Sequence, residues 1–319
     1  MRVRHLLPYL FAAVFVAPGV RAETPQDDGA ARHMPLAAQG MLLDAVAAGP
    51  RLVAVGEHGN VVLSDDQGKS WRQAKSVPTR TTLTAVAFVD GQHGFMVGHG
   101  GQILASEDGG ERWKVVAGKL EGRDSLFAIR FRDAKQGYAV GPYGYALATG
   151  DGGASWSPLT IAEGEDGEKH LNAVFGDGGG RIYLAAEGGT VFTSDDQGQS
   201  WQAQKTPYQG SLWGGLARRD GSIVVWGMAG HALVSKDRGA SWTELTTNTT
   251  QSLTAGVELG DGTLVFVGLS GAVSHGTPDT GFESFIRENR MSATAVLPLE
   301  GGLLLFGQDG ATRIDWPPR

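Results

Sequence analysis

One eight-residue pattern recurs five times along this chain at an almost constant spacing. The pattern is [S/T]-x-D-x-G-x-x-W, and its successive tryptophans are 42, 43, 45 and 41 positions apart. A period this regular indicates a repeat protein whose units stack around one continuous core. The five copies span residues 64–71, 106–113, 149–156, 194–201 and 235–242.

Each period also contains four short apolar segments, which we expect to be β-strands. In the second repeat these segments are 83–88, 94–98, 102–106 and 113–116, with turn signals such as Asp90-Gly91 between them. Four short strands per period of about 40 residues are typical of a β-propeller blade. We therefore predict an all-β propeller that spans 39–319.

A second marker, G-x-x-G between the second and third strands, counts the blades. Six units carry it, and Ala186–Gly189 takes its place in the fourth unit, which predicts seven four-stranded blades. The seventh unit ends after three strands, near Trp316. We expect His33–Ala37 to supply the missing outer strand and to close the ring. The six copies are 56–59, 98–101, 141–144, 227–230, 268–271 and 307–310.

The first 38 residues precede the repeats. A basic start, an apolar run over 6–16 and small residues up to Ala22 indicate a cleavable export signal over 1–22, followed by a leader over 23–38. The chain contains no cysteine, so it has neither disulfides nor thiol chemistry. We expect a periplasmic or otherwise exported protein that is soluble after cleavage and does not insert into the membrane.

The charge balance is acidic. The chain has 27 basic and 34 acidic residues, a formal net charge of −7, and loss of the three signal-peptide arginines makes this −10. An acidic chain is a poor partner for nucleic acids. We expect a monomer without a bound cofactor or metal.

The repeated pattern itself favours a structural role. Its aspartate lies where a hairpin turns and can accept hydrogen bonds from backbone N–H groups and from the preceding hydroxyl, while its tryptophan can pack between blades. Five near-identical copies cannot all be catalytic, and each offers too few oxygens for a calcium loop. The structural residues are Asp66, Trp71, Asp108, Trp113, Asp151, Trp156, Asp196, Trp201, Asp237 and Trp242.

This pattern is the Asp-box, or bacterial neuraminidase repeat. A longer pattern, V-G-x-x-G followed by an apolar strand and the Asp-box, occurs at Val97–Trp113 and Val140–Trp156. Over residues 40–316 the chain resembles the photosystem II stability/assembly factor family and its non-photosynthetic exported relatives. The resemblance implies a non-enzymatic propeller that binds other proteins during assembly of a membrane complex. In non-photosynthetic bacteria it implies an accessory partner of envelope machinery, such as a resistance-nodulation-division type transporter.

The non-repeating residues predict where a partner binds. Strand direction alternates, so the G-x-x-G turns and the connections between blades share one face, which we call the turn face, and the Asp-boxes share the other. Three arginines precede an innermost strand by three positions and predict a basic ring for a carboxylate-rich partner. An arginine-lined face is also what the family resemblance implies. The candidate partner-binding residues are Arg80, Arg123, Arg290, His58, His99, Tyr143, Glu187 and Asp309.

A carbohydrate-binding or sialidase-like propeller is the alternative. Sialidases need an arginine triad, and their early R-I-P element is replaced here by Arg51-Leu52-Val53. Other glycosidases need two facing carboxylates, whereas the turn face offers only scattered ones such as Glu57. A metal at His58 and His99 would need a third donor. We therefore expect no enzymatic activity.

Overall fold

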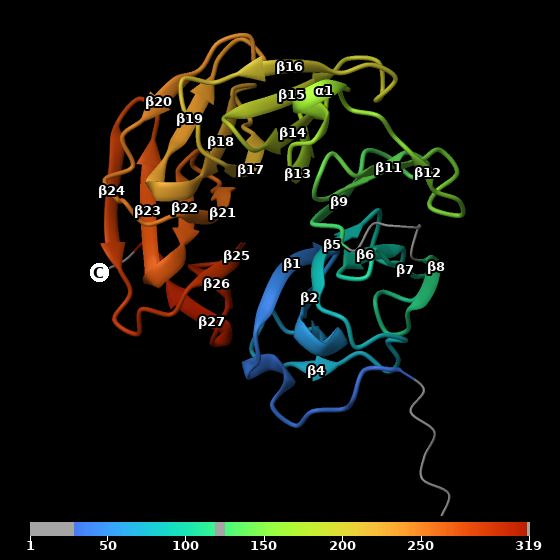
Figure 1. The fold of residues 1–319 in the computed structure, drawn as a ribbon. Coiled ribbons are helices and arrows are strands. Elements are labelled where there is room, and N and C mark those ends of the chain that lie inside the picture. Colours follow the sequence, from blue (N-terminus) through green and yellow to red (C-terminus); the bar gives the residue numbers. More distant parts are fainter. Residues whose placement is uncertain (1–28, 119–124, 318–319) are drawn as a thin grey trace, which may run out of the picture.

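The computed structural model describes residues 29–118 and 125–317, and it shows seven antiparallel sheets arranged in a ring (Figure 1). Within these residues six sheets have four strands and one has three. Each sheet is built from strands that follow one another in the chain. The seven-bladed all-β propeller expected from the repeats is confirmed, whereas the export signal over 1–22 lies outside the described residues.

The first four blades run from residue 42 to residue 205. Their strands are β1 (Leu42–Ala48), β2 (Arg51–Gly56), β3 (Val61–Ser64), β4 (Arg72–Gln73), β5 (Leu83–Phe88), β6 (Gly94–Gly98), β7 (Ile103–Ser106), β8 (Lys114–Ala117), β9 (Ala128–Phe131), β10 (Gly137–Val140), β11 (Ala146–Thr149), β12 (Ser157–Pro158), β13 (Leu171–Gly176), β14 (Ile182–Ala186), β15 (Thr190–Ser194) and β16 (Gln202–Lys205).

The last three blades run from residue 212 to residue 315. Their strands are β17 (Leu212–Ala217), β18 (Ile223–Gly227), β19 (Ala232–Ser235), β20 (Thr243–Leu245), β21 (Leu253–Glu258), β22 (Leu264–Gly268), β23 (Ala272–Thr277), β24 (Gly281–Ile286), β25 (Ala293–Leu299), β26 (Gly302–Gly307) and β27 (Gly310–Asp315). Short helical turns are η1 (Ala37–Gln39), η2 (Glu57–Gly59), α1 (Gly164–Gly167), η3 (Met228–Gly230) and η4 (Leu269–Gly271).

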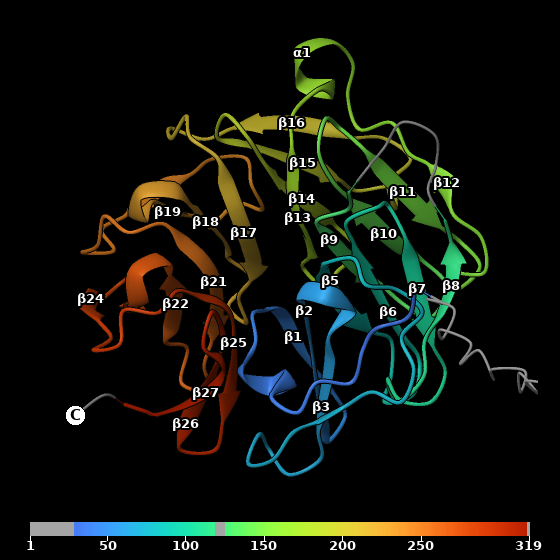
Figure 2. The ribbon, with the colours of Figure 1, turned by 60° about the horizontal axis from the view of Figure 1, so that its bottom comes forward.

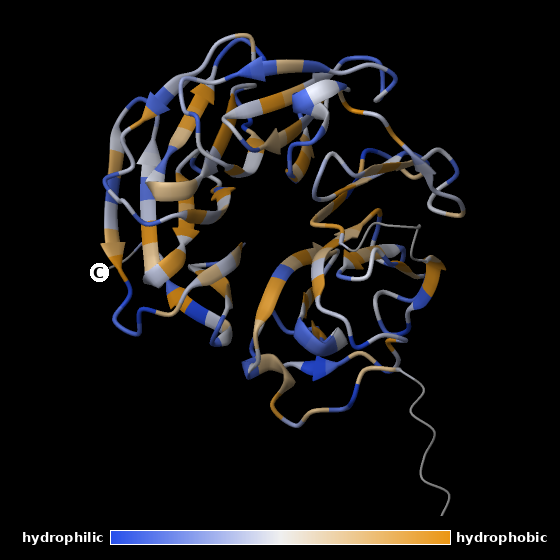
Figure 3. Ribbon diagram, in the orientation of Figure 1, coloured by the Kyte–Doolittle hydropathy of each residue, from blue (hydrophilic) through white to orange (hydrophobic). Residues whose placement is uncertain are grey.

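The core lies between adjacent blades. The innermost strands contact one another around the ring, from β1 and β5 through to β25 and β1. The second strands of the blades are continuous apolar runs (Figure 3), because both of their faces are covered by neighbouring blades. All five residues of β6, for example, are buried. Leu63 of one blade and Met96 of the next belong to the same buried cluster.

The ring closes by packing between the seventh and first blades. Trp71 meets Phe306 edge-on, with ring centroids 5.8 Å apart, and the Thr294 hydroxyl donates to the Leu42 carbonyl at 2.7 Å. The prediction that His33–Ala37 forms the fourth strand is wrong, and blade seven has three strands among the described residues.

The physical reason lies in the sequence around Pro35. Proline cannot donate a ladder hydrogen bond, and the chain turns there instead: the Ala37 N–H donates to the Met34 carbonyl, and the Gln39 N–H donates to the Leu36 carbonyl. The segment therefore enters η1, which contacts β27 without extending its sheet.

The helical elements are all short. Figure 2 shows α1 projecting from the ring between β12 and β13. Within 29–118 and 125–317 no helix has the length and hydropathy needed to cross a membrane.

Candidate functional site

Each Asp-box folds into a hairpin whose aspartate is bonded within the hairpin. The Ser64 hydroxyl donates to Asp66 Oδ1 at 2.8 Å, and Asp66 also accepts the Ser70 N–H at 2.9 Å and the Ser70 hydroxyl at 2.6 Å. The hydroxyl bond from Ser70 and then its N–H hold the pKa of Asp66 at about 2. The same causes hold the pKa of Asp151, Asp196 and Asp237 at about 2. The carboxylate is thus engaged by its own hairpin.

The Asp-box also fastens each blade to the one before it. Gly68 has a φ of +79°, which favours glycine, and a Cβ there would lie 2.8 Å from a methyl carbon of Leu304 in the neighbouring blade. Trp113 is 5% exposed and belongs to a cluster with Leu63 of the preceding blade. Its indole N–H donates to the Gly110 carbonyl at 2.9 Å, which leaves the ring both packed and satisfied.

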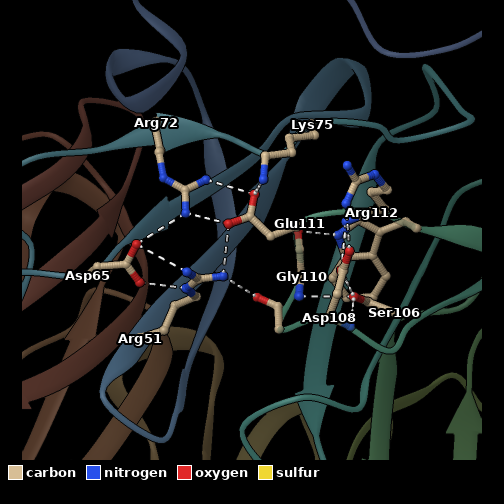
Figure 4. A network of polar contacts seen from close by, with 11 residues as sticks. Arg51, Asp65, Arg72, Lys75, Ser106, Asp108, Gly110, Glu111 and Arg112 are labelled. Carbon is tan, nitrogen blue, oxygen red and sulfur yellow. Dashed lines mark hydrogen bonds and ion pairs between the residues drawn. The ribbon is translucent and has the colours of Figure 1, made fainter.

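Charged side chains on the Asp-box face pair with one another across blades one and two (Figure 4). Arg51 Nε lies 2.6 Å from Asp65 Oδ1, and Arg51 Nη1 lies 3.2 Å from Glu111 Oε1. Arg72 Nη2 lies 2.6 Å from the same Glu111 oxygen, and this contact is the main reason that the pKa of Glu111 is lowered. Arg51 therefore links two blades, in a role unlike that of a substrate-binding arginine.

The same arrangement recurs between blades four and five. Arg181 pairs with Asp195 and donates from Nη1 to the Arg238 carbonyl at 2.6 Å, just as Arg51 donates to the Gly109 carbonyl. The charged side chains described on this face thus form ion pairs with one another.

Glycine fixes the backbone of the turn face and leaves two tip residues free to vary. A Cβ at Gly56 would lie 2.1 Å from the Met41 carbonyl oxygen, and one at Gly59 would lie 2.0 Å from the Thr79 carbonyl oxygen. The two residues between them, Glu57 and His58, are exposed. The turn can therefore present different side chains on an unchanged backbone.

Large apolar side chains are exposed at three of these tips. Tyr143 is 66% exposed, Met228 43% and Leu269 38%, in blades three, five and six. Exposed apolar side chains of this size are a common mark of a protein-binding surface when they share one face.

Two histidines add aromatic contacts to the same region. The His170 ring lies 4.6 Å from the Tyr143 ring, and its Nδ1 accepts the Tyr143 N–H at 3.1 Å. Glu187 accepts the His170 N–H at 3.0 Å. One blade further on, His231 stacks on Tyr208 with ring centroids 4.1 Å apart. Tyr143 and Glu187, both named from the sequence, are thus brought together through His170.

A cleft of about 930 Å³ lies beside this group, between blades five and six. Its lining includes His231, Glu244, Thr247, Gln251 and Ile286. Sequence reasoning missed His231 and Glu244, although His231 directly follows the last glycine of the G-x-x-G turn in blade five. The His231 Nδ1 and a Glu244 carboxylate oxygen are hydrogen-bonded. The pairing of β19 with β20 places these two residues side by side.

Two members of the predicted arginine ring, Arg80 and Arg290, lie in the part of the chain that the structure describes. Arg80 Nε donates to the Ala30 carbonyl at 2.7 Å and so holds the N-terminal segment against the ring. Arg290 is exposed on the turn face, and blades seven and one lie between Arg290 and Arg80. Arg123 lies outside the described residues. Asp309 is bonded to Arg287 at 2.8 Å.

The histidines of blades one and two do not form a metal site. Among residues 29–118 and 125–317 no group of three or more histidine or acidic side chains could hold a metal ion. His58 and His99 stand at the tips of neighbouring turns, where His99 donates its N–H to the Thr82 carbonyl at 2.9 Å.

Two sequence comparisons find proteins that are similar to parts of this chain. Residues 74–224, which contain blades two to four and the first strand of blade five, match the family described as "Photosynthesis system II assembly factor YCF48". A second match is the uncharacterised protein YkuO of Bacillus subtilis strain 168, which is 41% identical over 69 residues. That match covers 21% of this chain and 22% of YkuO.

Solved structures share the fold at low identity. A structure of YCF48 bound to D1 peptide has a TM-score of 0.72 and 17% identity over 89% of this chain and 95% of its own. YCF48 from Cyanidioschyzon merolae has a TM-score of 0.69 and 14% identity over 90% and 98%. Virginiamycin B lyase from Staphylococcus aureus has a TM-score of 0.74 and 9% identity, over 89% of this chain and 97% of its own. Because this neighbour is a lyase, the fold alone does not distinguish binding from catalysis. By its repeats, its seven blades and the matched segment, the chain is similar to the YCF48 family of β-propellers.

Proposed function

We propose that this protein is an exported, non-enzymatic accessory factor that binds a partner protein through the turn face of blades three to six. The observation that carries the proposal is the difference between the two faces. Apolar and aromatic side chains are exposed on the turn face, while arginines and acids on the opposite face are paired with one another. A YCF48 protein has been solved with D1 peptide, which supports a protein-binding role for this relative as well.

The partner in this proposal is a component of a membrane complex in the cell envelope. The N-terminal pattern over 1–22 supports export, and the family supports a role in assembling such a complex. A resistance-nodulation-division type transporter is the first partner to test. The factor acts as a monomer.

The cleft between blades five and six favours one alternative, glycan binding. Thr246, Thr250 and Gln251 supply hydrogen-bonding groups there, and Phe285 supplies an apolar ring. Saturable binding of the mature protein to a glycan panel would favour this alternative, and the absence of such binding would favour a protein partner.

In-cell crosslinking of the tagged mature protein, followed by mass spectrometry, tests the proposal. The variant combines Tyr143→Ala, Met228→Ala and Leu269→Ala. Val115→Ala is the matched control, because Val115 is equally apolar and 43% exposed but lies on the outer strand β8. We expect the triple variant to lose the crosslinked envelope protein and the control to retain it. Full recovery of the partner by the triple variant would refute the assignment to this face.

A further inference from the structure

No strand among residues 29–118 and 125–317 pairs with the outer edge of blade seven. In blades one, two, four and five every residue of the third strand is buried, because a fourth strand lies beyond it. The equivalent strand β27 is buried only at Gly310, while Arg313 and Asp315 are exposed. In blade seven the third strand is therefore more exposed than the third strands of these four blades.

The backbone of β27 offers hydrogen-bonding groups along this edge. The Trp316 N–H donates to the Gly301 carbonyl, and β27 pairs with β26 in regular antiparallel register. Bonding alternates in such a pair, so every second residue turns both backbone groups outward. These residues are Ala311, Arg313 and Asp315, and no strand among residues 29–118 and 125–317 pairs with them.

The space beside this edge has a mixed polar and apolar lining. A cavity of about 530 Å³ adjoins Ala311 and is lined by Leu36 of the N-terminal segment and by Trp71. Leu36 is 65% exposed. Figure 1 shows β27 as the outermost arrow of its blade, next to η1. A side chain projecting from an added strand could contact Leu36 and Trp71 in this cavity.

The described N-terminal segment does not occupy this edge. The Ala31 N–H donates to the Val77 carbonyl at 2.9 Å, and the Met34 N–H donates to Gln73 Oε1 at 2.6 Å. The segment therefore runs along the outside of blade one and begins at its boundary with blade two, on the side away from β27.

We propose that the β27 edge binds an extended segment of a partner protein as an antiparallel fourth strand. All six complete blades pair their third and fourth strands in this direction. Peptide addition to an exposed sheet edge is a common recognition mode, in which the backbone supplies affinity and alternate side chains supply specificity. This site is separate from the turn face, and the proposal does not depend on that face being a binding surface.

The side chains of β27 define the chemistry of the segment. Ala311 packs towards blade one, whereas Ile314 and Trp316 pack towards blade six, so Arg313 and Asp315 share the blade-one side with Ala311. Directly opposed residues contact one another on the same side of a sheet. The segment therefore carries a basic, an acidic and an apolar residue at alternate positions, opposite Asp315, Arg313 and Ala311 in that order.

Peptide binding to the mature protein, residues 23–319, tests the proposal. The probe is an eight-residue peptide with lysine, glutamate and leucine at alternate positions and threonine or valine between them. N-methylation of those three residues removes the N–H groups that would face β27, and we expect affinity to fall more than about tenfold. N-methylation of the intervening residues is the matched control, and we expect a change of less than about threefold. Equal affinity of the two N-methylated peptides, or no binding of the parent peptide, would overturn the proposal.

Two measurements on the protein locate the peptide. Arg313→Glu should weaken the parent peptide by up to about fivefold, and replacing the glutamate of the peptide by lysine should restore binding. The amide protons of Ala311, Arg313 and Asp315 should exchange rapidly in the free protein and slowly in the complex. Slow exchange already in the free protein would overturn the proposal, because it would mean that the chain's own N-terminal residues or a second copy covers the edge.

Discussion

The two faces of the ring are built from the same number of turns per blade but use their side chains differently. On the Asp-box face the same residues recur, and Asp66 accepts its hydrogen bonds from its own hairpin. On the turn face the backbone recurs while the tips change, from His58 in blade one to Tyr143 in blade three. The comparison teaches that repetition marks the residues that hold the ring, and that departure from repetition marks residues available for binding.

Removal of a packed Asp-box tryptophan should have the largest effect. Trp113→Ala deletes a ring that is 5% exposed and packs against blade one, and we expect a loss of about 3–5 kcal/mol in the free energy of unfolding. Chemical denaturation of the mature protein measures it. A loss of only about 0.5 kcal/mol, typical of surface positions, would remove the distinction between the faces.

Acid should weaken the Asp-box face next. The pKa of Asp66 is about 2 in the folded protein, chiefly through the Ser70 hydroxyl, and about 3.9 in an unfolded chain. A lowered pKa stabilises the fold above pH 4, and this stabilisation is lost as the pH falls towards 2. Thermal unfolding between pH 5 and pH 2 measures the loss. Replacing Ser70, Ser155, Ser200 and Ser241 by alanine should flatten that dependence, and an unchanged slope would contradict the hydrogen-bond origin of the shift.

Asp44 provides the control for this pH series, because it acts in the opposite direction. Burial raises its pKa to about 6, against the hydrogen bonds that it accepts from the Val86 and Ala45 N–H groups. A raised pKa lowers stability as the pH rises from about 4 through 6. Asp44→Asn should reduce the change in midpoint between pH 4 and pH 7 while leaving the loss below pH 4 intact.

Breaking the charge network should have a smaller effect. Glu111→Gln weakens the ion pairs with Arg51 and Arg72 across blades one and two, and we expect a loss of about 1 kcal/mol. High salt should shrink the difference between variant and wild type, because it screens exposed charges. A difference that stays constant from low to high salt would indicate lost packing instead of lost charge.

Changes at the turn tips should have the smallest effect on stability. Met228→Ser and Leu269→Ser replace exposed side chains at tips whose backbone is set by the flanking glycines, and we expect each to change stability by less than about 0.5 kcal/mol. Partner crosslinking should nevertheless fall. Unfolding at much lower temperature in either variant would mean that the tips also hold the ring.

Much of the scaffold can be read from the repeats, and much of the candidate site cannot. The spacing of Trp71, Trp113 and the later tryptophans predicts the blades because each copy makes the same local hairpin. The pairing of His231 with Glu244 depends on the register of β19 with β20, and the stacking of Tyr208 on His231 depends on two neighbouring blades. Such contacts leave no repeated signal in the chain.

Blade seven illustrates the same division. The sequence by itself determined three strands after residue 292, because their apolar segments flank a recognisable G-x-x-G turn. It also determined the hairpins, since the Asp-box bonds are local. Only the tertiary structure decided that Pro35 and η1 turn the N-terminal segment along blade one and that Arg80 holds Ala30. It also decided that no other described strand pairs with the outer edge of β27. The reason is physical: local hydrogen bonds follow from neighbouring residues, whereas ring closure depends on which distant surfaces pack together.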